Sequence, residues 1–264
     1  MKAEKQLIVI SDLDGTLLDH YSYQFDAAQP ALALLADNHI PLIINSSKTA
    51  AEIIDIRRTL HNHQPFIAEN GGGIYLPEGR DFRLIPMGTP RVEFLPKVAA
   101  TREELRLSFT GFDDMDTAQL QACTGLSEQA CLRAKQRDFT EPLLWQDTDE
   151  ALQDFTARIQ AQGLRVIRGG RFVHISGPTD KGEAIRWMRQ HFQQQLDCEV
   201  EVIALGDSDN DLQMLAQADH PFLILSPVHP PPATDIHNLK ISTSIGPSGW
   251  NECICDFLEK REIL

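Results

Sequence analysis

The sequence predicts an α/β protein with a Rossmann-like core, a doubly wound and mainly parallel sheet, into which an α+β domain is inserted. Short apolar, β-branched runs alternate with stretches of helical period near the start of the chain and again toward its end. This alternation is typical of parallel strands joined by helices. Three of the runs end in clusters of polar residues, as expected where ligands bind at the carboxyl ends of strands. The middle of the chain instead has the patterning of antiparallel hairpins.

The first predicted strand, residues 7–11, is a short apolar run that ends directly before Asp12 and Asp14. Two carboxylates this close repel each other and favour a bound cation. Oxygen ligands without a neighbouring His or Cys suit Mg²⁺ better than Zn²⁺. One carboxylate is able to act as a nucleophile and the other as a general acid and base. An ordinary turn that includes Gly15 is the alternative interpretation of this segment taken alone.

A second predicted strand, residues 41–45, follows a helix at 29–38 and precedes another at 50–60. Between this strand and the following helix lie Ser46, Ser47, Lys48 and Thr49. These hydroxyls and the lysine are suited to hold a phosphate oxygen. They are also suited to cap the helix, and both roles are compatible because a helix N-terminus is itself an anion site.

The next predicted strand, residues 66–68, leads into Glu69, Asn70 and three consecutive glycines. Three glycines predict a tight, backbone-rich turn into a hairpin. We interpret Glu69 and Asn70 as structural residues of this turn. Residues 82–85 are expected to form a further strand.

From about residue 85 to 178 the pattern changes to that of an α+β block. Ser127 is the expected N-cap of one of its helices, with Glu128 in the first turn. Gly169 and Gly170 are expected to form the turn of a hairpin. The block is predicted to contain helices at 101–107, after 117, after 127 and at 149–162, and strands at 141–145, 163–168 and 171–176.

Lys181 follows Asp180 at the start of a predicted helix that carries Ile185, Met188 and Phe192 on one face. A cation in the first turn of a helix opposes the macrodipole, which indicates a role beyond solvation. A solvated surface lysine is the alternative interpretation.

The strand predicted at residues 200–205 ends in a dense run of three carboxylates and one amide, Asp207, Asp209, Asn210 and Asp211. A calcium loop of the EF-hand type that began at Asp207 would need Gly and Glu at its sixth and twelfth positions. Those positions hold Leu212 and Ala218, so this run is not such a loop. Further strands are expected at 223–225 and 239–242, and a final helix at 249–262.

The composition limits the class of partner. The net charge of −14 argues against nucleic acid and against an anionic membrane surface. Five cysteines without metal-ligand spacing indicate reduced thiols in the cytoplasm. The sequence has neither a signal peptide nor an apolar run of the ~18 residues that a membrane helix requires. It does not determine the oligomeric state.

Four motifs in this order resemble the haloacid dehalogenase superfamily of phosphatases. They are Asp12-x-Asp14-Gly15-Thr16, a hydroxyl at Ser46 after the second strand, Lys181 at a helix start, and Gly206-Asp207-x-x-Asn210-Asp211. The insertion resembles the larger α/β cap domain of that superfamily. The resemblance implies a catalytic core formed by residues 1–84 and 179–264, and a cap formed by 85–178.

Within the superfamily, the chain resembles the mannosyl-3-phosphoglycerate phosphatases. The runs that carry this resemblance are residues 21–23, 45–49, 69–72, 137–143 and 169–172. Many superfamily members have Thr-Gly-Arg after the second strand, whereas this chain has Ser46-Ser47-Lys48, as that subfamily does. The resemblance implies a small phosphorylated sugar or glycerate as the substrate.

The resemblance also implies roles for individual residues. Asp12 would attack phosphorus and become an aspartyl phosphate. Asp14 would protonate the leaving alkoxide and then deprotonate the attacking water. Ser46 and Lys181 would bind the oxygens of the phosphoryl group. Mg²⁺ would be held by Asp12, the backbone carbonyl of Asp14 and Asp207, with Asp211 as a direct ligand or as a support of the other ligands.

A glycosyl-phosphoglycerate carries a carboxylate beside its phosphate, so a cation should recognise it. Arg171, beside Gly170, is the first candidate, and Lys48, beside Ser47, is the second. Arg137 and Arg168 are weaker candidates, because exposed charge is the default for arginine. The alternatives are another sugar phosphatase, a phosphomutase and a non-catalytic metabolite-binding protein, and the intact set of acids argues against the last.

Overall fold

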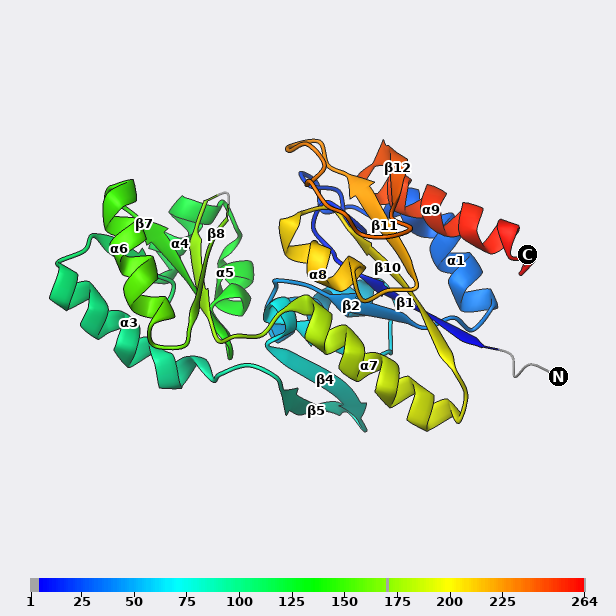
Figure 1. Cartoon of the computed structure of the whole chain (residues 1–264), viewed down its shortest axis with the longest axis horizontal. Coiled ribbons are helices and arrows are strands. Elements are labelled where there is room, and N and C mark those ends of the chain that lie inside the picture. The colour runs from blue at the N-terminus through cyan, green and yellow to red at the C-terminus, as the bar shows by residue number, and fades with distance from the viewer. Residues whose placement is uncertain (1–4, 170, 264) are drawn as a thin grey trace.

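The structure of the protein is a computed structural model that describes residues 5–169 and 171–263. Figure 1 shows two lobes side by side, each built on its own sheet, with the chain passing from the larger lobe to the smaller one and back. Across the described residues, the larger sheet has the strand order β12 (Lys240–Ile245), β11 (His220–Leu225), β10 (Val200–Gly206), β1 (Gln6–Ser11), β2 (Leu42–Asn45), β3 (Phe66–Ala68), β4 (Gly73–Glu78) and β5 (Asp81–Pro86).

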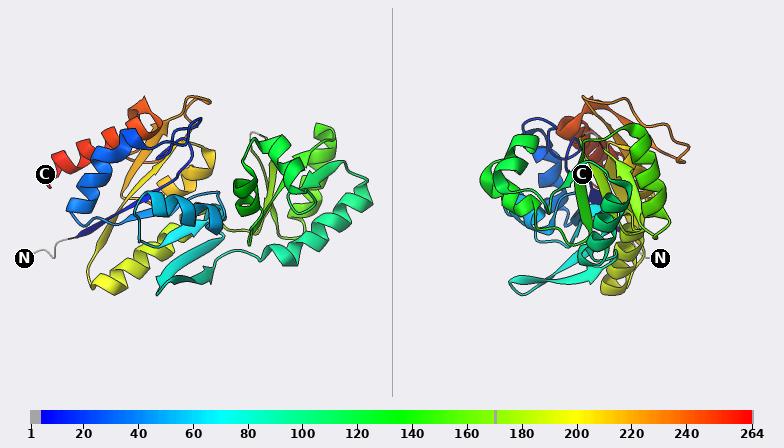
Figure 2. Two further views of the ribbon diagram at one scale, coloured as in Figure 1. Left: turned by 180° about the vertical axis from the view of Figure 1, so that it is seen from behind. Right: turned by 90° about the vertical axis from the view of Figure 1, so that its left-hand side faces the viewer.

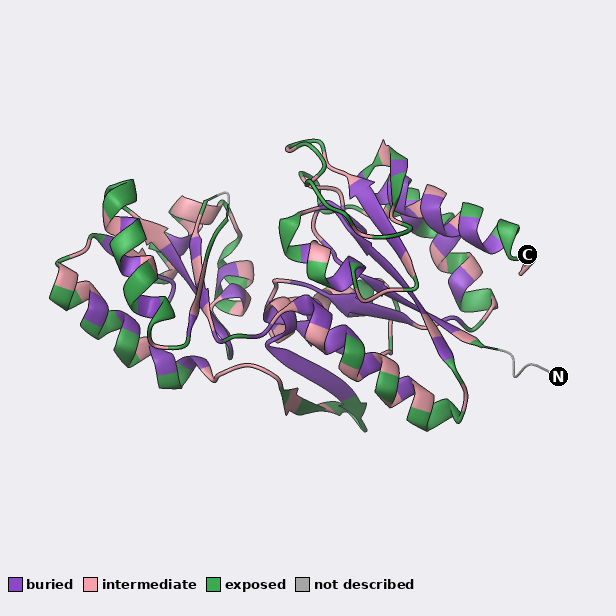
Figure 3. Cartoon of the chain, in the orientation of Figure 1, coloured by how far each residue is buried: buried purple, intermediate pink, exposed green. Residues whose placement is uncertain are grey.

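The strands from β12 to β3 are parallel, and the hairpin of β4 and β5 adds two antiparallel strands at one edge. Strand β1 lies in the middle, between β10 and β2. Its residues from Leu7 onward are buried, as Figure 3 shows for the centre of this sheet. A strand covered on both faces is apolar without alternation, which explains the continuous run in the sequence. The predicted fold class is confirmed.

Helices cover both faces of the larger sheet, so the sheet is doubly wound. One face packs against α1 (Gln29–Asp37), α2 (Ala50–Thr59) and α9 (Gly246–Lys260), with Trp250 fully buried among them. The other face packs against α7 (Lys181–Leu196) and the short α8 (Leu212–Leu215). Figure 2 shows α1 and α9 together on one side of β1 and α7 on the other.

The smaller sheet is antiparallel, with the order β6 (Phe109–Gly111), β7 (Thr140–Trp145), β9 (Val173–Ser176) and β8 (Arg165–Arg168). Helices α3 (Arg91–Leu105) and α6 (Asp149–Gln160) bury Phe94, Phe155 and Ile159 against it. Leu120 and Cys131, from α4 (Thr117–Thr124) and α5 (Glu128–Ala134), belong to a second apolar cluster. Ser127 caps α5 as predicted, since its hydroxyl accepts a hydrogen bond from Ala130 N.

Some predicted boundaries were wrong. Helix α3 begins at Arg91, ten residues before the predicted start at 101, and ends at Leu105. Pro96 lies inside it, and an internal proline normally indicates a helix break. Burial of Phe94 and Val98 on the two sides of Pro96 supports the continuous helix. The last helix begins at Gly246, three residues before the predicted start, with a proline in its first turn.

Strand β6 and helix α8 were not predicted, since each has only three or four residues. Strand β11 begins at His220 and includes Pro221, three residues before the expected start at 223. We propose the predicted domain boundaries, 1–84 and 179–264 for the core and 85–178 for the cap, although β5 extends two residues past the first of them. Among the described residues, no helix is both long and apolar enough to span a bilayer.

Candidate active site

The register of the parallel strands brings the predicted motifs to one edge of the larger sheet. Ser11, at the end of β1, pairs with Leu205 of β10 and with Ile44 of β2. Asp12 therefore lies level with the last residues of both neighbouring strands. The loops that follow these strands carry Asp207 on one side and Ser46 on the other.

Lys181 lies at the same edge of the sheet. It is the first residue of α7, which follows the insertion in the sequence. Its ammonium Nζ lies 2.5 Å from Asp12 Oδ1 and 2.6 Å from Asp211 Oδ1. The lysine side chain is fully buried, so it is not a solvated surface residue. Burial lowers the pKa of Lys181, but the carboxylates of Asp12 and Asp211 outweigh it and hold the pKa above its usual value. Lys181 is therefore a buried cation between two carboxylates.

Three buried carboxylates form a compact cluster beside this lysine. One oxygen from each of Asp12, Asp207 and Asp211 lies within 4.8 Å of the others. Burial, with the neighbouring Asp211, raises the pKa of Asp207 to about 6. The three carboxylates carry more negative charge than the ammonium group of Lys181 can balance. Buried charge is costly unless an opposite charge compensates it. The residues therefore fit a divalent cation that prefers oxygen ligands.

Tight packing around the cluster depends on Gly15. Its φ is +79°, and a Cβ atom there would lie 2.6 Å from Asp207 Oδ2. Glycine adopts this conformation without steric cost, and any side chain would displace the carboxylate. Two further groups approach Asp207: Thr16 Oγ1, from the first predicted motif, lies 3.4 Å from Oδ1, and His229 Nε2, which the sequence did not indicate, lies 3.4 Å from Oδ2.

Asp14 lies beside the cluster and pairs with Lys48. The distance from Lys48 Nζ to Asp14 Oδ2 is 2.9 Å. The other oxygen, Asp14 Oδ1, is buried and has no hydrogen-bond partner in the part of the chain that the structure describes. Burial lowers the pKa of Lys48, but the carboxylates of Asp14 and Glu52 outweigh it and raise the pKa above its usual value. One oxygen of Asp14 is thus paired with a cation, while the other has no hydrogen-bond partner among the described residues.

Of the polar residues that follow β2, Thr49 caps a helix, whereas Ser46 and Ser47 do not. Thr49 caps α2: its hydroxyl accepts from Glu52 N at 3.2 Å, and the Glu52 carboxylate accepts from Thr49 N at 2.9 Å. Ser46 is buried, and its hydroxyl accepts from Lys48 N at 3.2 Å. Ser47 is partly exposed. Because Thr49 supplies the cap, Ser46 and Ser47 are not needed for it.

Glu69 and Asn70 lie between the site and the smaller lobe, since the Glu69 carboxylate accepts a hydrogen bond from Thr140 N of β7 at 2.8 Å. Both have positive φ, +53° and +57°. Asn70 Oδ1 accepts a hydrogen bond from Asn210 Nδ2 at 3.2 Å, in the loop that carries Asp207 and Asp211. The interpretation of Glu69 and Asn70 as structural agrees with these contacts. Their position between the lobes had no signal in the sequence.

The cap arginines lie apart from the acidic cluster. Arg171 is exposed, and its Nη1 donates to the carbonyl of Cys123 at 2.6 Å. Within the described residues, no hydrogen bond or ion pair joins Arg171 to the acidic cluster. Gly170, predicted beside it in the site, lies outside the described residues. Arg168 pairs with Asp149 on the surface, and Arg137 donates to Thr140 Oγ1.

A doubly wound core, an acidic cluster at the carboxyl ends of its strands and an α+β insertion are together typical of enzymes that carry a cap domain on a Rossmann-like core. The chain belongs to the haloacid dehalogenase-like hydrolase family, whose profile matches residues 9–115 and 134–225. The predicted resemblance to that superfamily is confirmed.

Two curated relatives are similar over almost the whole chain. A protein of Methanococcoides burtonii is 38% identical over 96% of this chain and 98% of its own length. A protein of Persephonella marina is 31% identical over 97% of this chain and 98% of its own length. Both are named glucosyl-3-phosphoglycerate/mannosyl-3-phosphoglycerate phosphatase. The resemblance to this subfamily is confirmed as well.

Solved structures share the fold at low sequence identity. A phosphatase of the haloalkanoate dehalogenase superfamily from Bacteroides thetaiotaomicron matches 99% of this chain and 97% of its own, with a TM-score of 0.70 and 17% identity. The sucrose-phosphatase of Synechocystis, solved with sucrose and phosphate, matches 96% of this chain and 98% of its own, with a TM-score of 0.60 and 15% identity.

Proposed function

We propose that the protein is a Mg²⁺-dependent phosphomonoesterase that removes phosphate from mannosyl-3-phosphoglycerate or glucosyl-3-phosphoglycerate through an aspartyl-phosphate intermediate. The observation that carries the proposal is the contact of Lys181 with both Asp12 and Asp211, inside a buried carboxylate cluster. The intact set of acids argues against a binding protein without catalytic function, because binding alone does not need Asp14. The names of the two relatives support the substrate.

The cation would be held by Asp12, Asp207 and the backbone carbonyl of Asp14, with Asp211 as a further ligand or as their support. When bound, Mg²⁺ reduces the repulsion between a carboxylate nucleophile and a phosphate dianion. The buried cluster supports this assignment, because its carboxylates exceed the positive charge of Lys181.

In the first step a carboxylate oxygen of Asp12 would attack phosphorus, and the bond from phosphorus to the ester oxygen would break. Asp14, in its protonated form, would give its proton to the leaving alkoxide. In the second step Asp14 would take a proton from a water molecule that attacks phosphorus, which releases inorganic phosphate and restores Asp12. Asp14 Oδ1, which has no hydrogen-bond partner among the described residues, supports this double role.

Ser46, Ser47 and Lys181 would bind the oxygens of the phosphoryl group. Charge spreads over these oxygens in the transition state, and fixed donors next to them lower the barrier. Burial of Ser46 and Lys181 supports the assignment, because donors held by the protein need no reorganisation.

Lys48, Arg171 and the neighbouring Gly170 would contribute to recognition of the glycerate carboxylate. Lys48 lies beside Asp14, where the leaving group departs. Arg171 is in the cap, which would close over the substrate and exclude water. The five cysteines are thiols, which supports a reducing, cytoplasmic environment.

A phosphate-release assay tests the proposal. The full-length protein is assayed with Mg²⁺ and with EDTA on a panel of phosphoesters that includes both glycosyl-3-phosphoglycerates and common sugar phosphates. We expect Mg²⁺-dependent release that is fastest with a glycosyl-3-phosphoglycerate and absent in Asp12→Asn. Transfer of phosphate to a sugar acceptor instead of water would identify a phosphomutase. Absence of release from every phosphoester would overturn the proposal.

A further inference from the structure

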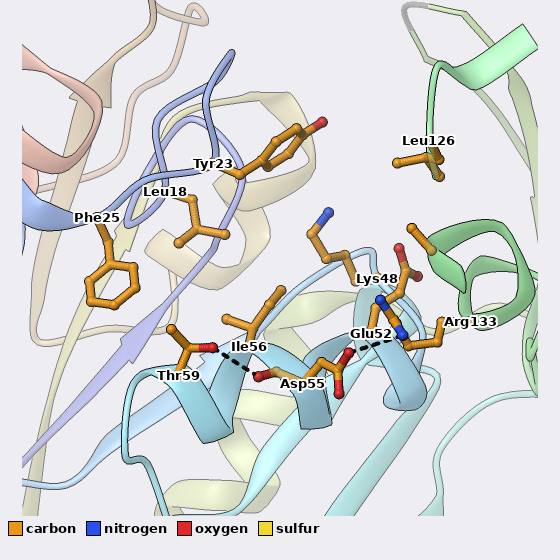
Figure 4. A pocket seen from close by; sticks show the side chains of 11 residues that line it. Leu18, Tyr23, Phe25, Lys48, Glu52, Asp55, Ile56, Thr59, Leu126 and Arg133 are labelled. Atoms are coloured by element: carbon orange, nitrogen blue, oxygen red, sulfur yellow. Dashed lines mark hydrogen bonds and ion pairs between the residues drawn. The ribbon is translucent and has the colours of Figure 1, made fainter. Parts of the chain in front are cut away.

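A cavity of about 240 Å³ opens between the two lobes, next to the proposed site. Its walls come from the loop after β1, from α2 and from the segment 126–133 of the cap (Figure 4). The apolar lining includes Leu18, Phe25, Ile56 and Leu126, and the polar lining includes Glu52 and Arg133. A concave surface of this mixed character is typical of a binding site for a small organic ligand.

Lys48 connects this cavity to Asp14. Its ammonium lines the cavity, lies 2.9 Å from Asp14 Oδ2 and lies 5.1 Å from the centre of the Tyr23 ring. Leu18, another residue of the wall, forms a β-bridge with Asp14. Two residues of the cavity wall, Lys48 and Leu18, therefore contact the residue that would protonate the leaving group. A leaving group that departs from phosphorus beside Asp14 has this space next to it.

Tyr23 forms the part of the core wall that faces the cap. Its side chain is among the large exposed ones of the protein, with 51% of the residue accessible. The loop that carries it is fixed, because the Asp19 carboxylate accepts hydrogen bonds from the backbone N–H groups of Tyr21 and Ser22. Tyr23 N donates to the Asp19 carbonyl at 3.0 Å. An aromatic ring is thus presented to the cavity on a well-defined turn.

The opposite wall is held to the core by two contacts of Arg133. Its Nη1 lies 3.1 Å from Asp55 Oδ2 in α2, and its backbone carbonyl accepts from Thr49 Oγ1 at 3.0 Å. Figure 4 shows Tyr23 and Lys48 on the core side and Leu126 on the cap side, with Arg133 reaching from the cap to Asp55 of α2. One wall of the cavity thus comes from each lobe, and the two contacts of Arg133 hold the walls together at one end.

We propose that this cavity binds the sugar ring of the substrate, with Tyr23 as its specificity-determining wall on the core. This inference rests on the proposed function and adds where the glycosyl group lies. The volume is below the ~300–1,000 Å³ of pockets for drug-sized ligands, as expected for a single ring. Apolar walls suit the C–H face of a sugar, whereas Glu52, Asp55 and Arg133 suit its hydroxyl groups.

The test compares substrates with and without the sugar. We measure kcat/KM of the wild type, Tyr23→Ala and Tyr23→Phe with mannosyl-3-phosphoglycerate, glucosyl-3-phosphoglycerate and 3-phosphoglycerate. Tyr23→Ala should lower kcat/KM for the glycosylated substrates by roughly 10- to 100-fold, the usual scale for losing one apolar contact in a pocket. Its effect on 3-phosphoglycerate should stay within about twofold, and Tyr23→Phe should retain most of the activity.

Tyr21→Ala is the matched control. Tyr21 lies in the same loop, is 70% exposed and does not line the cavity. We expect it to leave kcat/KM within about twofold for all three substrates. Equal losses in the two Ala variants, or equal losses with and without the sugar, would overturn the inference.

A binding measurement separates this inference from the proposed function. Calorimetry with mannosylglycerate and glucosylglycerate, which carry no phosphate, requires no turnover. We expect at least one of the two to bind the wild type, and its Kd to rise by at least ~10-fold in Tyr23→Ala but not in Tyr21→Ala. Binding without any phosphatase activity would overturn the proposed function alone. A Kd that Tyr23→Ala leaves unchanged, or no binding of either glycosylglycerate to the wild type, would overturn the inference.

Discussion

The carboxylate of Glu69 accepts hydrogen bonds from both the backbone N–H and the hydroxyl of Thr140, at 2.8 and 2.6 Å. It also accepts from Asp138 N and Phe139 N, at 2.7 and 3.1 Å. Glu69 is buried at the end of β3 in the larger sheet, and Thr140 begins β7 of the smaller sheet. One buried carboxylate therefore binds the start of a cap strand to the core, and four donors compensate its burial.

Replacement of Glu69 by Gln should lower the stability of the protein. The amide retains one acceptor oxygen and turns its NH₂ group toward N–H donors, so buried donors lose their partner. We expect the free energy of unfolding to fall by about 1.5–3 kcal/mol, the scale for hydrogen bonds to a charged group. Chemical denaturation measures this. Glu78→Gln, on an exposed strand end, is the control and should change stability by less than ~0.5 kcal/mol.

Asp14→Asn should lower kcat by at least ~10², because an amide neither donates the proton that the leaving alkoxide needs nor accepts one from water. The size of the side chain is unchanged, so the fold should persist and the thermal midpoint should stay close to that of the wild type. Steady-state kinetics with the best substrate of the panel checks this. An unchanged kcat would remove Asp14 from the role of acid and base.

Lys181→Met should destabilise the protein by about 3–5 kcal/mol in EDTA, because two buried carboxylates lose their cation. Methionine has a similar length, so lost packing contributes little. Lys260→Met is the control, since Lys260 pairs with Asp256 on the surface with 74% of its side chain exposed. Denaturation curves of the two variants measure the difference. Equal stability of the two variants would show that the charge of Lys181 is not needed to compensate the cluster.

Mg²⁺ should stabilise the wild type and should stabilise Asp207→Asn much less. Binding to the native state alone adds about 2.7 kcal/mol at a ligand concentration of 100 Kd. Asp207→Asn removes one charged ligand and lowers the affinity, so the thermal midpoint should respond less to the same Mg²⁺ concentration. Differential scanning fluorimetry with a Mg²⁺ titration checks this. An identical response in both proteins would exclude Asp207 as a ligand.

Glu201 should make stability depend on pH in the acidic range. Burial raises the pKa of Glu201, but His220 and Arg261 outweigh it and lower the pKa to about 2, from an ordinary value of 4.5. The folded state therefore favours the ionised carboxylate. The contribution of the Glu201 carboxylate to the free energy of unfolding is fully present above pH 4.5 and is lost as the pH falls toward 2.

The comparison of wild type with Glu201→Gln measures this contribution. We expect a difference in unfolding free energy of about 1 kcal/mol at pH 7, the upper range for partly exposed pairs. The difference should shrink between pH 4.5 and 3.5. A difference that stays constant over this range would contradict the assignment of the depressed pKa to Glu201.

Much of the fold was visible in the sequence because parallel strands buried on both faces are continuous apolar runs. Strands β1, β2, β3 and β10 were located within about a residue, and their carboxyl ends carry the motif residues. The errors fall where local rules and packing disagree. Pro96 predicts a break, but burial of Phe94 and Val98 supports one helix across it. Strand β6 has too few residues to show a period.

The sequence by itself determined which residue types stand at the carboxyl ends of the strands, Asp12, Asp14, Ser46 and Asp207, because the position of a strand end is a local property. Only the tertiary structure decided how these residues pair. It placed Lys181 between Asp12 and Asp211, Lys48 on Asp14, and Glu69 against the cap. Such contacts join residues that are far apart in the chain, and the strand register and the packing of the two lobes set their distances.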